Sequence, residues 1–249
     1  MPMTPTEPPP ARTATVVVAG DDVFEDLFTA AVALQSLLTA EGFAARTALG
    51  TAVFEDAGAR IAHDDLIVLY TAAGRFTAGQ RRGLAQAVHD GAGLIAVHSA
   101  NLNLSGGARP GAGGDPLLDL IGSRYISHGP PPHESRFRVR LDDGHEVTAG
   151  IAPFDVTHEH YRIETAPDAR ILAWRRAGGE GDGDRDRDGD GDGDTGSSDE
   201  PLMHVRTHGA GRVCYLQLGH DLRIWGEPPV RRLVRRAARW ACRGAVRGV

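Results

Sequence analysis

The fold follows from residues 64–101, which read DDLIVLYTAAGRFTAGQRRGLAQAVHDGAGLIAVHSAN. Residues 65–70 and 93–97 are short apolar runs, typical of strands that are covered on both faces. Between them, the segment Thr77-Ala78-Gly79-Gln80 matches a capping box and predicts the start of a helix, which Gly91 ends. A strand, a helix and a second strand in this order predict a right-handed βαβ unit and a parallel sheet.

The same alternation precedes this segment, with a strand expected at 15–19, a helix at 24–40 and a weaker strand at 43–49. We therefore expect an α/β fold with a doubly wound, flavodoxin-like, mostly parallel sheet and helices on both faces. Beyond a short helix at 116–121 the pattern changes to shorter and alternating strands. These are expected at 124–127, 135–141, 161–164, 169–175, 202–206 and 212–218, before a last helix at about 229–243.

The chain is expected to form a single domain over residues 13–245. Residues 1–12 contain five prolines and predict a disordered tail. Residues 178–200 are an Asp/Gly-rich insertion, which we interpret as a disordered loop between two strands. Asp184, Asp186 and Asp188 match the start of a calcium-binding loop, but an alternating repeat produces such matches by itself and no flanking helices are predicted.

Composition argues against several classes of partner and location. The net charge of −6 arises from residues 178–200, which carry −8, so the remaining chain offers no field for nucleic acid. No apolar run is long enough to cross a membrane and no secretory signal is visible, so a cytoplasmic location is expected. Cys214 and Cys242 are too few for a disulfide framework and are expected to be reduced and buried. A homodimer is the default expectation for the assembly.

A ligand site is expected where the carboxyl ends of the parallel strands meet. In a doubly wound sheet this edge lies near the point where the strand order reverses. The strand ends predicted here are Gly20 to Asp22, Tyr70 to Gly74, and His98 to Asn101. The sequence therefore predicts a site that includes His98 and Ser99.

Further polar clusters follow other predicted strands. They are His128, the tetrapeptide His158-Glu159-His160-Tyr161, and Gly219-His220-Asp221 with Trp225 close behind. Such a set allows three kinds of chemistry. It could bind a divalent metal such as zinc or manganese, it could provide Glu159 and a histidine as general base and acid, or it could hydrogen-bond a polyol on which Trp225 or Tyr161 stacks.

The alternation of a strand divides the tetrapeptide between two faces. Glu159 and Tyr161 share one face and can act together, whereas His158 and His160 lie on the other and are not expected to join them. Nucleophilic catalysis is not expected. The segment 97–101 lacks the flanking glycines of a nucleophile elbow, so Ser99 is an unfavourable nucleophile. No Walker loop and no GxGxxG follows the first strand, so no nucleotide cofactor is expected.

Several segments resemble the ThuA-like (trehalose utilisation) family, which is related to the class I glutamine amidotransferases. The matching segments are residues 65–70 with 74–77, GAGLIAVHSA (91–100), LIGSRY (120–125) with His128, FDVTHEHY (154–161), HGAGRVCY (208–215), GHD (219–221) with Trp225, and RWA (239–241). Their order and spacing, more than any single motif, carry the resemblance, and they span about residues 14–243. His158 stands where the family usually has an acidic residue, His145-Glu146-Val147 replaces its common His-Pro-Ile/Val, and the Asp-Gly insertion is foreign to it.

The resemblance implies one α/β domain without the amidotransferase cysteine, and a role in the use of trehalose or related 3-keto-disaccharides. Carried over by position, its polar residues are His98, His128, Glu159, Tyr161, His220 and Asp221. Our first hypothesis is an enzyme that isomerises, or eliminates from, a keto-sugar, aided or not by a metal. Its expected catalytic residues are Glu159, His220, His98 and Tyr161, and its expected substrate-binding residues are Ser99, His128, Asp221 and Trp225. The alternative is a non-catalytic sugar-binding or regulatory domain on the same scaffold.

Overall fold

The computed structural model describes residues 11–20, 26–55, 61–72, 75–102, 109–129, 131–176 and 199–242. Three predictions lie wholly or partly outside these ranges. They concern the Pro-rich tail, the strand-end positions Asp21, Asp22 and Gly74, and the Asp-Gly tract with its calcium-loop match.

Within the described residues, nine strands form one large sheet in the order β2-β1-β3-β4-β11-β10-β9-β6-β7. In chain order these strands are β1 (Thr13–Gly20), β2 (Ala44–Leu49), β3 (Leu66–Ala72), β4 (Gly93–Val97), β6 (Glu134–Leu141), β7 (Phe154–Glu159), β9 (Arg170–Arg176), β10 (Asp199–His208) and β11 (Gly211–Leu216). Two further strands, β5 (Ser123–Ser127) and β8 (Arg162–Thr165), pair antiparallel in a separate small sheet.

The first five strands of this order pair in parallel, which is the flavodoxin-type arrangement. The expected α/β fold class is confirmed in this half. The other half, from β10 to β7, pairs antiparallel and extends the sheet far beyond β11. The one-sided alternation of residues 135–141 reflects this extension, since such strands keep one face wet.

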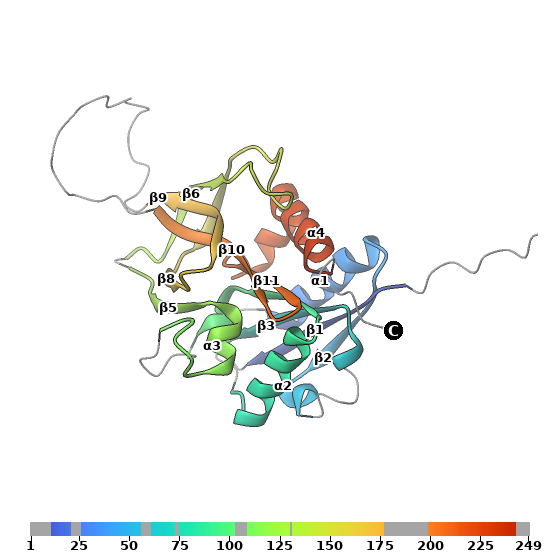
Figure 1. Cartoon of the computed structure of the whole chain (residues 1–249). Helices are drawn as coiled ribbons and strands as arrows, with labels where there is room; N and C mark the ends of the chain where they lie inside the picture. Colours follow the sequence, from blue (N-terminus) through green and yellow to red (C-terminus); the bar gives the residue numbers. More distant parts are fainter. Residues whose placement is uncertain are drawn as a thin grey trace, which may run out of the picture.

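Helices cover both faces of the parallel half. In Figure 1, α1 (Leu27–Ala40) and α4 (Pro228–Cys242) lie on one side, and α2 (Ala78–His89) and α3 (Pro116–Ile121) lie on the other. The two-residue period of β1 assigns its side chains to these layers. Val16 and Val18 pack in the core beneath α1 and α4, while Val17 packs in the core beneath α2 and α3.

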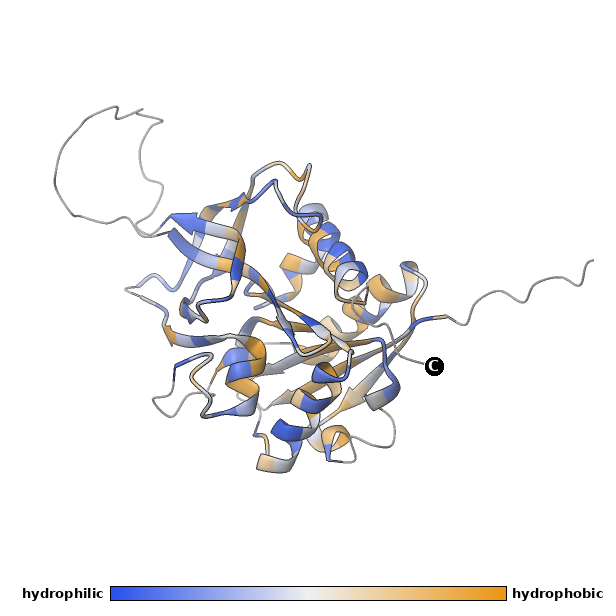
Figure 2. Cartoon of the chain, viewed as in Figure 1, coloured by the Kyte–Doolittle hydropathy of each residue, from blue (hydrophilic) through white to orange (hydrophobic). Residues whose placement is uncertain are grey.

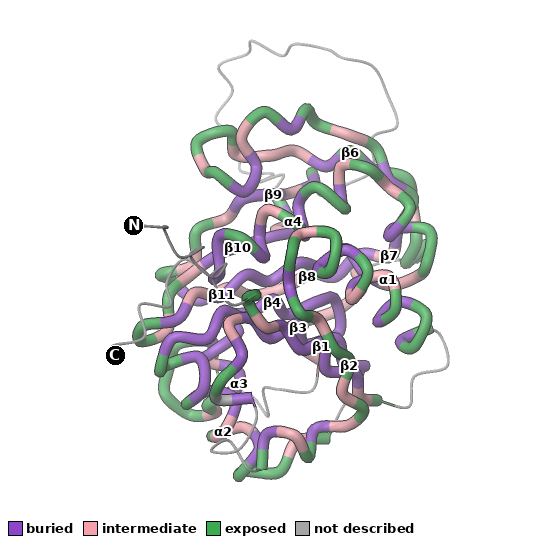
Figure 3. The backbone as a smooth tube through the Cα atoms, turned by 90° about the vertical axis from the view of Figure 1, so that its right-hand side faces the viewer, coloured by how far each residue is buried: buried purple, intermediate pink, exposed green. Residues whose placement is uncertain are grey.

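Apolar residues gather on the parallel strands and on the helix sides that face them (Figure 2). The buried segments accordingly lie along β1, β3, β4 and β11 (Figure 3). Arg235 and Arg239 on the outer side of α4 form ion pairs with Glu41 after α1, so these arginines tie two helices together. No helix in the described ranges is long and apolar enough to cross a membrane.

Short 3-10 helices connect several elements: η1 (Thr51–Phe54), η2 (Ile61–His63), η3 (His98–Asn101) and η4 (Leu222–Gly226). Two of them, η3 and η4, lie at the carboxyl edge of the parallel half, where β4 and β11 end. The chain that leaves β11 passes through Gln217, Gly219 and His220 before it enters η4. The fold therefore brings the polar segments after β4 and β11 to neighbouring positions.

Candidate active site

A sharp turn at the end of β4 presents His98. Its φ of 49° lies in the left-handed region, which residues other than glycine rarely adopt. Room for the turn comes from the neighbouring segment, because a Cβ on Gly219 would lie 2.5 Å from Val97 Cγ1 and 3.2 Å from His98 Cβ. A sharp strand-to-helix turn thus forms here without flanking glycines in its own segment. An imidazole occupies its tip, and Ser99 is buried in η3 behind it.

The contacts of His98 fix its tautomer. Its Nδ1 lies 2.7 Å from the backbone carbonyl oxygen of Gln217, and because a carbonyl oxygen only accepts, Nδ1 carries the hydrogen. Nε2 faces Glu159 Oε2 at 3.1 Å and the Tyr161 hydroxyl at 2.8 Å. The His98 ring also stacks on Tyr161, with 4.5 Å between centroids. Glu159 and Tyr161 therefore contact the same imidazole.

Glu159, the last residue of β7, is the centre of the cluster. Oε2 lies 3.1 Å from His98 Nε2 and 3.1 Å from His220 Nδ1, and Oε1 lies 3.0 Å from His128 Nε2. Burial alone would raise the pKa of this carboxyl group, but the contacts with the His220 and His98 imidazoles outweigh burial and hold the pKa well below its usual range. Glu159 is therefore ionised at neutral pH.

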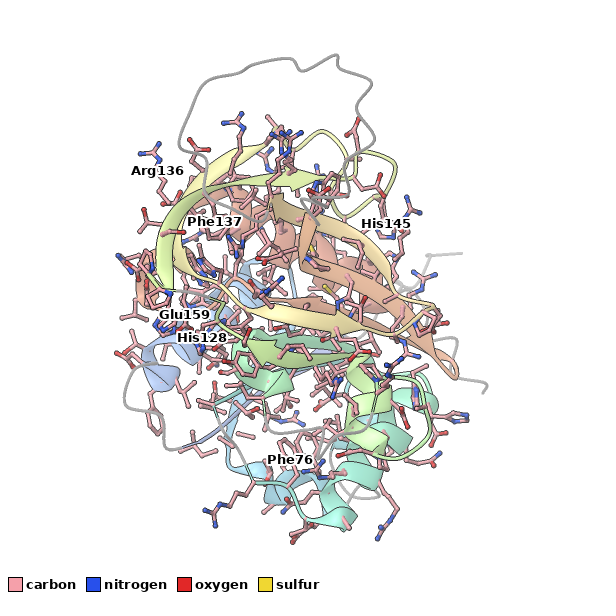
Figure 4. The ribbon with its side chains drawn as sticks, turned by 90° about the vertical axis from the view of Figure 1, so that its left-hand side faces the viewer. Phe76, His128, Arg136, Phe137, His145 and Glu159 are labelled. Atoms are coloured by element: carbon pink, nitrogen blue, oxygen red, sulfur yellow. The ribbon has the colours of Figure 1, made fainter. Side chains whose placement is uncertain are left out.

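His128 reaches Glu159 from β5 and its following turn, and Figure 4 shows the two residues side by side. The Tyr125 hydroxyl lies 2.6 Å from His128 Nδ1. Burial, and then the charge of Glu159, raise the pKa of Tyr125, so this phenol stays protonated and can donate to Nδ1. That donation leaves the hydrogen on His128 Nε2, where it points to the carboxylate. Tyr125 was not among the residues predicted from sequence.

His158 joins the cluster, which corrects the prediction from strand alternation. Its Nε2 accepts the backbone N–H groups of Gly219 and His220, both at 3.0 Å, and its Nδ1 donates to the backbone carbonyl of Glu159. Burial, followed by the nearby His98, lowers the pKa of His158 to about 3, so the ring is neutral at physiological pH. The alternation argument fails because β7 ends at Glu159, and only His160 is turned away, against Phe137.

Gln217 is the second residue that the sequence reasoning missed. Besides its carbonyl bond to His98, its side chain accepts from the backbone N–H of Tyr161 (3.2 Å) and donates to the Tyr161 carbonyl (3.0 Å). A signal was present, because Gln217 is a lone polar residue in the otherwise apolar run 213–218. A polar residue at such a position is usually buried with hydrogen-bond partners, as this one is.

Two of the expected substrate-binding residues make other contacts in the structure. The Trp225 indole is only 3% exposed and packs edge-on against Tyr70 in the core, so the structure does not present it for stacking on a sugar. Asp221 caps η4 and forms an ion pair with Arg223 at 2.5 Å. Burial raises the pKa of Asp221, but its hydrogen bonds with Arg223 outweigh burial and lower it.

An open cavity of about 400 Å³ adjoins the cluster at His220. Its other lining residues are Asp26, Glu134, Asp221, Leu222 and Arg223. The Arg223 guanidinium is engaged by Glu134 at 2.7 Å as well as by Asp221, so the lining has a surplus of negative charge. The side chains of His128, His220 and Glu159 are 31%, 19% and 16% exposed, whereas those of His98 and Tyr161 are buried.

This arrangement can transfer protons. An ionised carboxylate lies within hydrogen-bond distance of three imidazoles, and the carboxylate and two of the imidazoles reach solvent. His98, Glu159 and His220 also each offer one atom within 4.8 Å of the others, which is close enough to share a metal ion. Neither cysteine takes part, because both are buried free thiols and burial raises their pKa, that of Cys242 to about 12.

Comparison with known proteins matches most of the chain to one protein family. The family model ThuA, described as trehalose utilisation, matches residues 15–241. A crystal structure of a ThuA-like protein from Bacteroides uniformis has a TM-score of 0.68 and 16% sequence identity, over 96% of this chain and 95% of that one. A ThuA-like protein from Parabacteroides merdae has a TM-score of 0.66 and 17% identity, over 96% and 93%.

More distant structures share the fold. A cytoplasmic protein from Salmonella typhimurium has a TM-score of 0.58 and 10% identity, over 91% of this chain and 98% of that one. No curated protein matches the sequence. At these identities the solved structures establish the fold alone.

Proposed function

This chain belongs to the ThuA family of trehalose utilisation, and from that membership and the geometry of its cluster we propose that it catalyses acid–base chemistry on a keto-sugar. The substrate class is a 3-keto derivative of trehalose or of a related disaccharide, and the reaction is an isomerisation or an elimination. The reaction takes place in the cytoplasm, where the structural neighbour from Salmonella is described. We propose no glutaminase activity, since the residue at the tip of the β4 turn is His98 and not a cysteine.

One observation carries this proposal. His98, His128 and His220 lie far apart in the chain, yet all three converge on the single carboxylate of Glu159 within 3.1 Å. Carboxylates and imidazoles are the usual groups for proton transfer near neutral pH, and perturbed groups in a cleft mark catalytic sites.

Both reactions begin with the same step. Glu159 removes a proton from the carbon next to the ketone, and His220 donates a proton to the ketone oxygen, which gives an enediol. In an isomerisation, the neighbouring hydroxyl then loses its proton and the former ketone carbon gains one, so the ketone moves by one carbon. In an elimination, the group on the next carbon leaves with a proton instead. No oxidant or reductant is consumed in either case.

The buried members of the cluster hold these groups in place. His98 and Tyr161 lie behind Glu159, and His128 holds its second oxygen. The cavity lining favours a neutral polyol over a sugar phosphate, because three carboxylates, Asp26, Glu134 and Asp221, outnumber the single guanidinium of Arg223, which already pairs with Glu134 and Asp221.

Deuterium exchange tests the proposal directly. The full chain, incubated with 3-keto-trehalose in D₂O, is expected to replace the hydrogen next to the ketone by deuterium, which NMR detects without knowledge of the product. Glu159→Gln keeps the shape of the side chain but removes the base, and is expected to slow exchange by about 100-fold or more with little change in Tm.

The matched control is Glu164→Gln, the same substitution on β8, where Glu164 pairs with Arg124 outside the cluster. This variant is expected to exchange at the wild-type rate. Exchange at the wild-type rate in Glu159→Gln would refute the proposed base. Binding of the keto-sugar without any exchange by the wild-type protein would instead favour a non-catalytic sugar-binding domain.

A further inference from the structure

We propose that His98, Glu159 and His220 form a binding site for one divalent transition metal ion, with zinc as the leading candidate. The ligand atoms are His98 Nε2, a carboxylate oxygen of Glu159 and His220 Nδ1. The proposal concerns the cluster assigned above to proton transfer, but it rests on ligand geometry and not on the reaction.

The spacing of the three atoms fits a metal coordination sphere. Ligands about 2.1 Å from a zinc ion lie roughly 3.0–3.4 Å from one another in tetrahedral or octahedral geometry. Glu159 Oε2 lies 3.1 Å from His98 Nε2 and 3.1 Å from His220 Nδ1, and all three atoms lie within 4.8 Å of one another. Little rearrangement is therefore needed for one ion to contact all three.

The tautomer of His98 supplies the second argument. Its Nδ1 donates to the Gln217 carbonyl, so the lone pair of Nε2 is directed at Glu159. A lone pair and a carboxylate oxygen at 3.1 Å repel each other unless a positive charge lies between them, and a proton or a metal ion can provide that charge. A histidine that donates its other N–H to a backbone carbonyl is the usual orientation of a metal ligand.

Surrounding groups fix the other two ligands. His158 holds the backbone N–H of His220 at 3.0 Å, and His128 binds the second oxygen of Glu159 at 3.0 Å. Hydrogen-bond partners of this kind orient the metal-binding residues in metalloproteins. The Tyr161 hydroxyl, 2.8 Å from His98 Nε2, can donate to the same lone pair, so a bound metal would displace that hydrogen bond.

Ligand type indicates the class of metal. Two imidazoles and one carboxylate suit zinc, iron(II) or manganese and disfavour calcium, which prefers oxygen ligands alone. Three protein ligands leave further coordination positions for water or a substrate oxygen, as in catalytic zinc sites. The cavity that adjoins His220 gives such a ligand access.

Direct binding measurements test the site without reference to turnover. The full chain is stripped with a chelator and then titrated with Zn²⁺ by calorimetry and with Co²⁺ by visible absorption, which reports nitrogen ligation. We expect one tight equivalent in the wild-type protein, and a loss of affinity of about 100-fold or more in His220→Ala and in Glu159→Gln. His220 is partly exposed, so its truncation is compatible with folding, which circular dichroism checks.

The control is His133→Ala, which removes an exposed imidazole beside His128 but outside the ligand set, and it is expected to bind like the wild type. The seven aspartates of residues 181–194 are present in every variant, so weak binding there cancels in the comparison. The proposal is overturned if the wild type binds neither ion tightly, or if His220→Ala and Glu159→Gln both bind as tightly as His133→Ala. The Co²⁺ spectrum of the wild-type protein decides the question even if one variant fails to fold.

The outcomes separate this inference from the proposed reaction. Metal binding without deuterium exchange, with or without added Zn²⁺, would leave the metal site standing and refute the keto-sugar chemistry. Deuterium exchange at full rate in a protein that binds no metal would refute the metal site and leave the keto-sugar chemistry standing.

Discussion

The Gln217 side chain supports the candidate site through the backbone of Tyr161. Its side-chain amide accepts from the Tyr161 N–H and donates to the Tyr161 carbonyl, and it also donates to the Pro201 carbonyl at 3.3 Å. The Gln217 side chain and Tyr161 are buried, so water cannot replace the two hydrogen bonds between them.

We therefore expect Gln217→Leu to lower the free energy of unfolding by about 1–3 kcal/mol, because it leaves buried polar groups unpaired. The matched control is Gln35→Leu on α1, where the amide binds the Ala45 carbonyl and Thr47 in a half-exposed place. That variant is expected to lose less than about 1 kcal/mol. Urea denaturation measures both, and equal losses would contradict the argument.

The residue types at the site could be predicted from sequence, but several of their roles could not. His98, His128, Glu159, Tyr161 and His220 do meet, because each lies at or just after the end of a strand, and these strand ends lie on the same side of the fold. His158 and Gln217 were missed because their contacts depend on where β7 and β11 stop, and strand ends are the least certain feature of a sequence pattern. Trp225 was expected to bind substrate but is buried. The sequence around an aromatic residue next to a polar cluster is the same whether its ring faces the core or a cavity.

At the scale of elements, β10 carries a histidine that makes stability depend on pH. His204 is fully buried, its Nε2 donates to the Ile121 carbonyl at 3.0 Å, and its ring stacks on Tyr215. Burial lowers its pKa to about 4. The Ile121 bond and Asp168 oppose this shift, and Arg206 reinforces it.

The folded-state pKa of His204 lies below its unfolded value, so its contribution to stability is complete above about pH 6.5 and is lost as the pH falls towards 4. Within this window the free energy of unfolding is expected to fall by up to about 1.4 kcal/mol per pH unit from this group. His204→Gln keeps a donor for Ile121 but cannot titrate, so its stability should fall less steeply. Urea curves at several pH values test this, and parallel slopes for the two proteins would contradict it.

The elements of the parallel half could be predicted closely, because apolar runs between helices have few alternatives. The antiparallel half was harder to predict. Its strands were expected, apart from a strand range for β7, but their order was not. β6 pairs with β7, the next strand in the chain, and also with β9, which lies further along it. Single-chain patterns contain no signal for such pairings.

For the whole molecule, the insertion between β9 and β10 has a defined effect. Arg176 and Asp199, which flank it, are already register partners in the sheet. A loop that joins neighbouring positions adds only closure entropy, at about 0.6 kcal/mol for each doubling of its length. Replacing residues 181–194 by a short Gly-Ser link is therefore expected to leave the cluster unaffected and to stabilise the protein slightly, by less than about 1 kcal/mol.

Thermal and urea unfolding of the shortened chain measure the change in stability. The rate of deuterium exchange into the keto-sugar shows whether the cluster around Glu159 is unaffected. Calorimetric titration with calcium is expected to give no micromolar binding that the replacement abolishes. A large loss of stability, or such binding, would show that the tract has a structural role.

The expected homodimer stays a prediction, which analytical ultracentrifugation of the full chain tests.

The sheet order has one last consequence. Glu159 belongs to the outermost strand, β7, yet its carboxylate contacts His98 at the end of β4, near the middle of the same sheet. The sheet must therefore curl until its rim meets its centre, and the residues around Glu159 come together only when that closure is complete. A chain stalled before this step would have a hydrophobic core and regular helices but an incomplete cluster, so the proposed proton transfer would report that the last strand has docked.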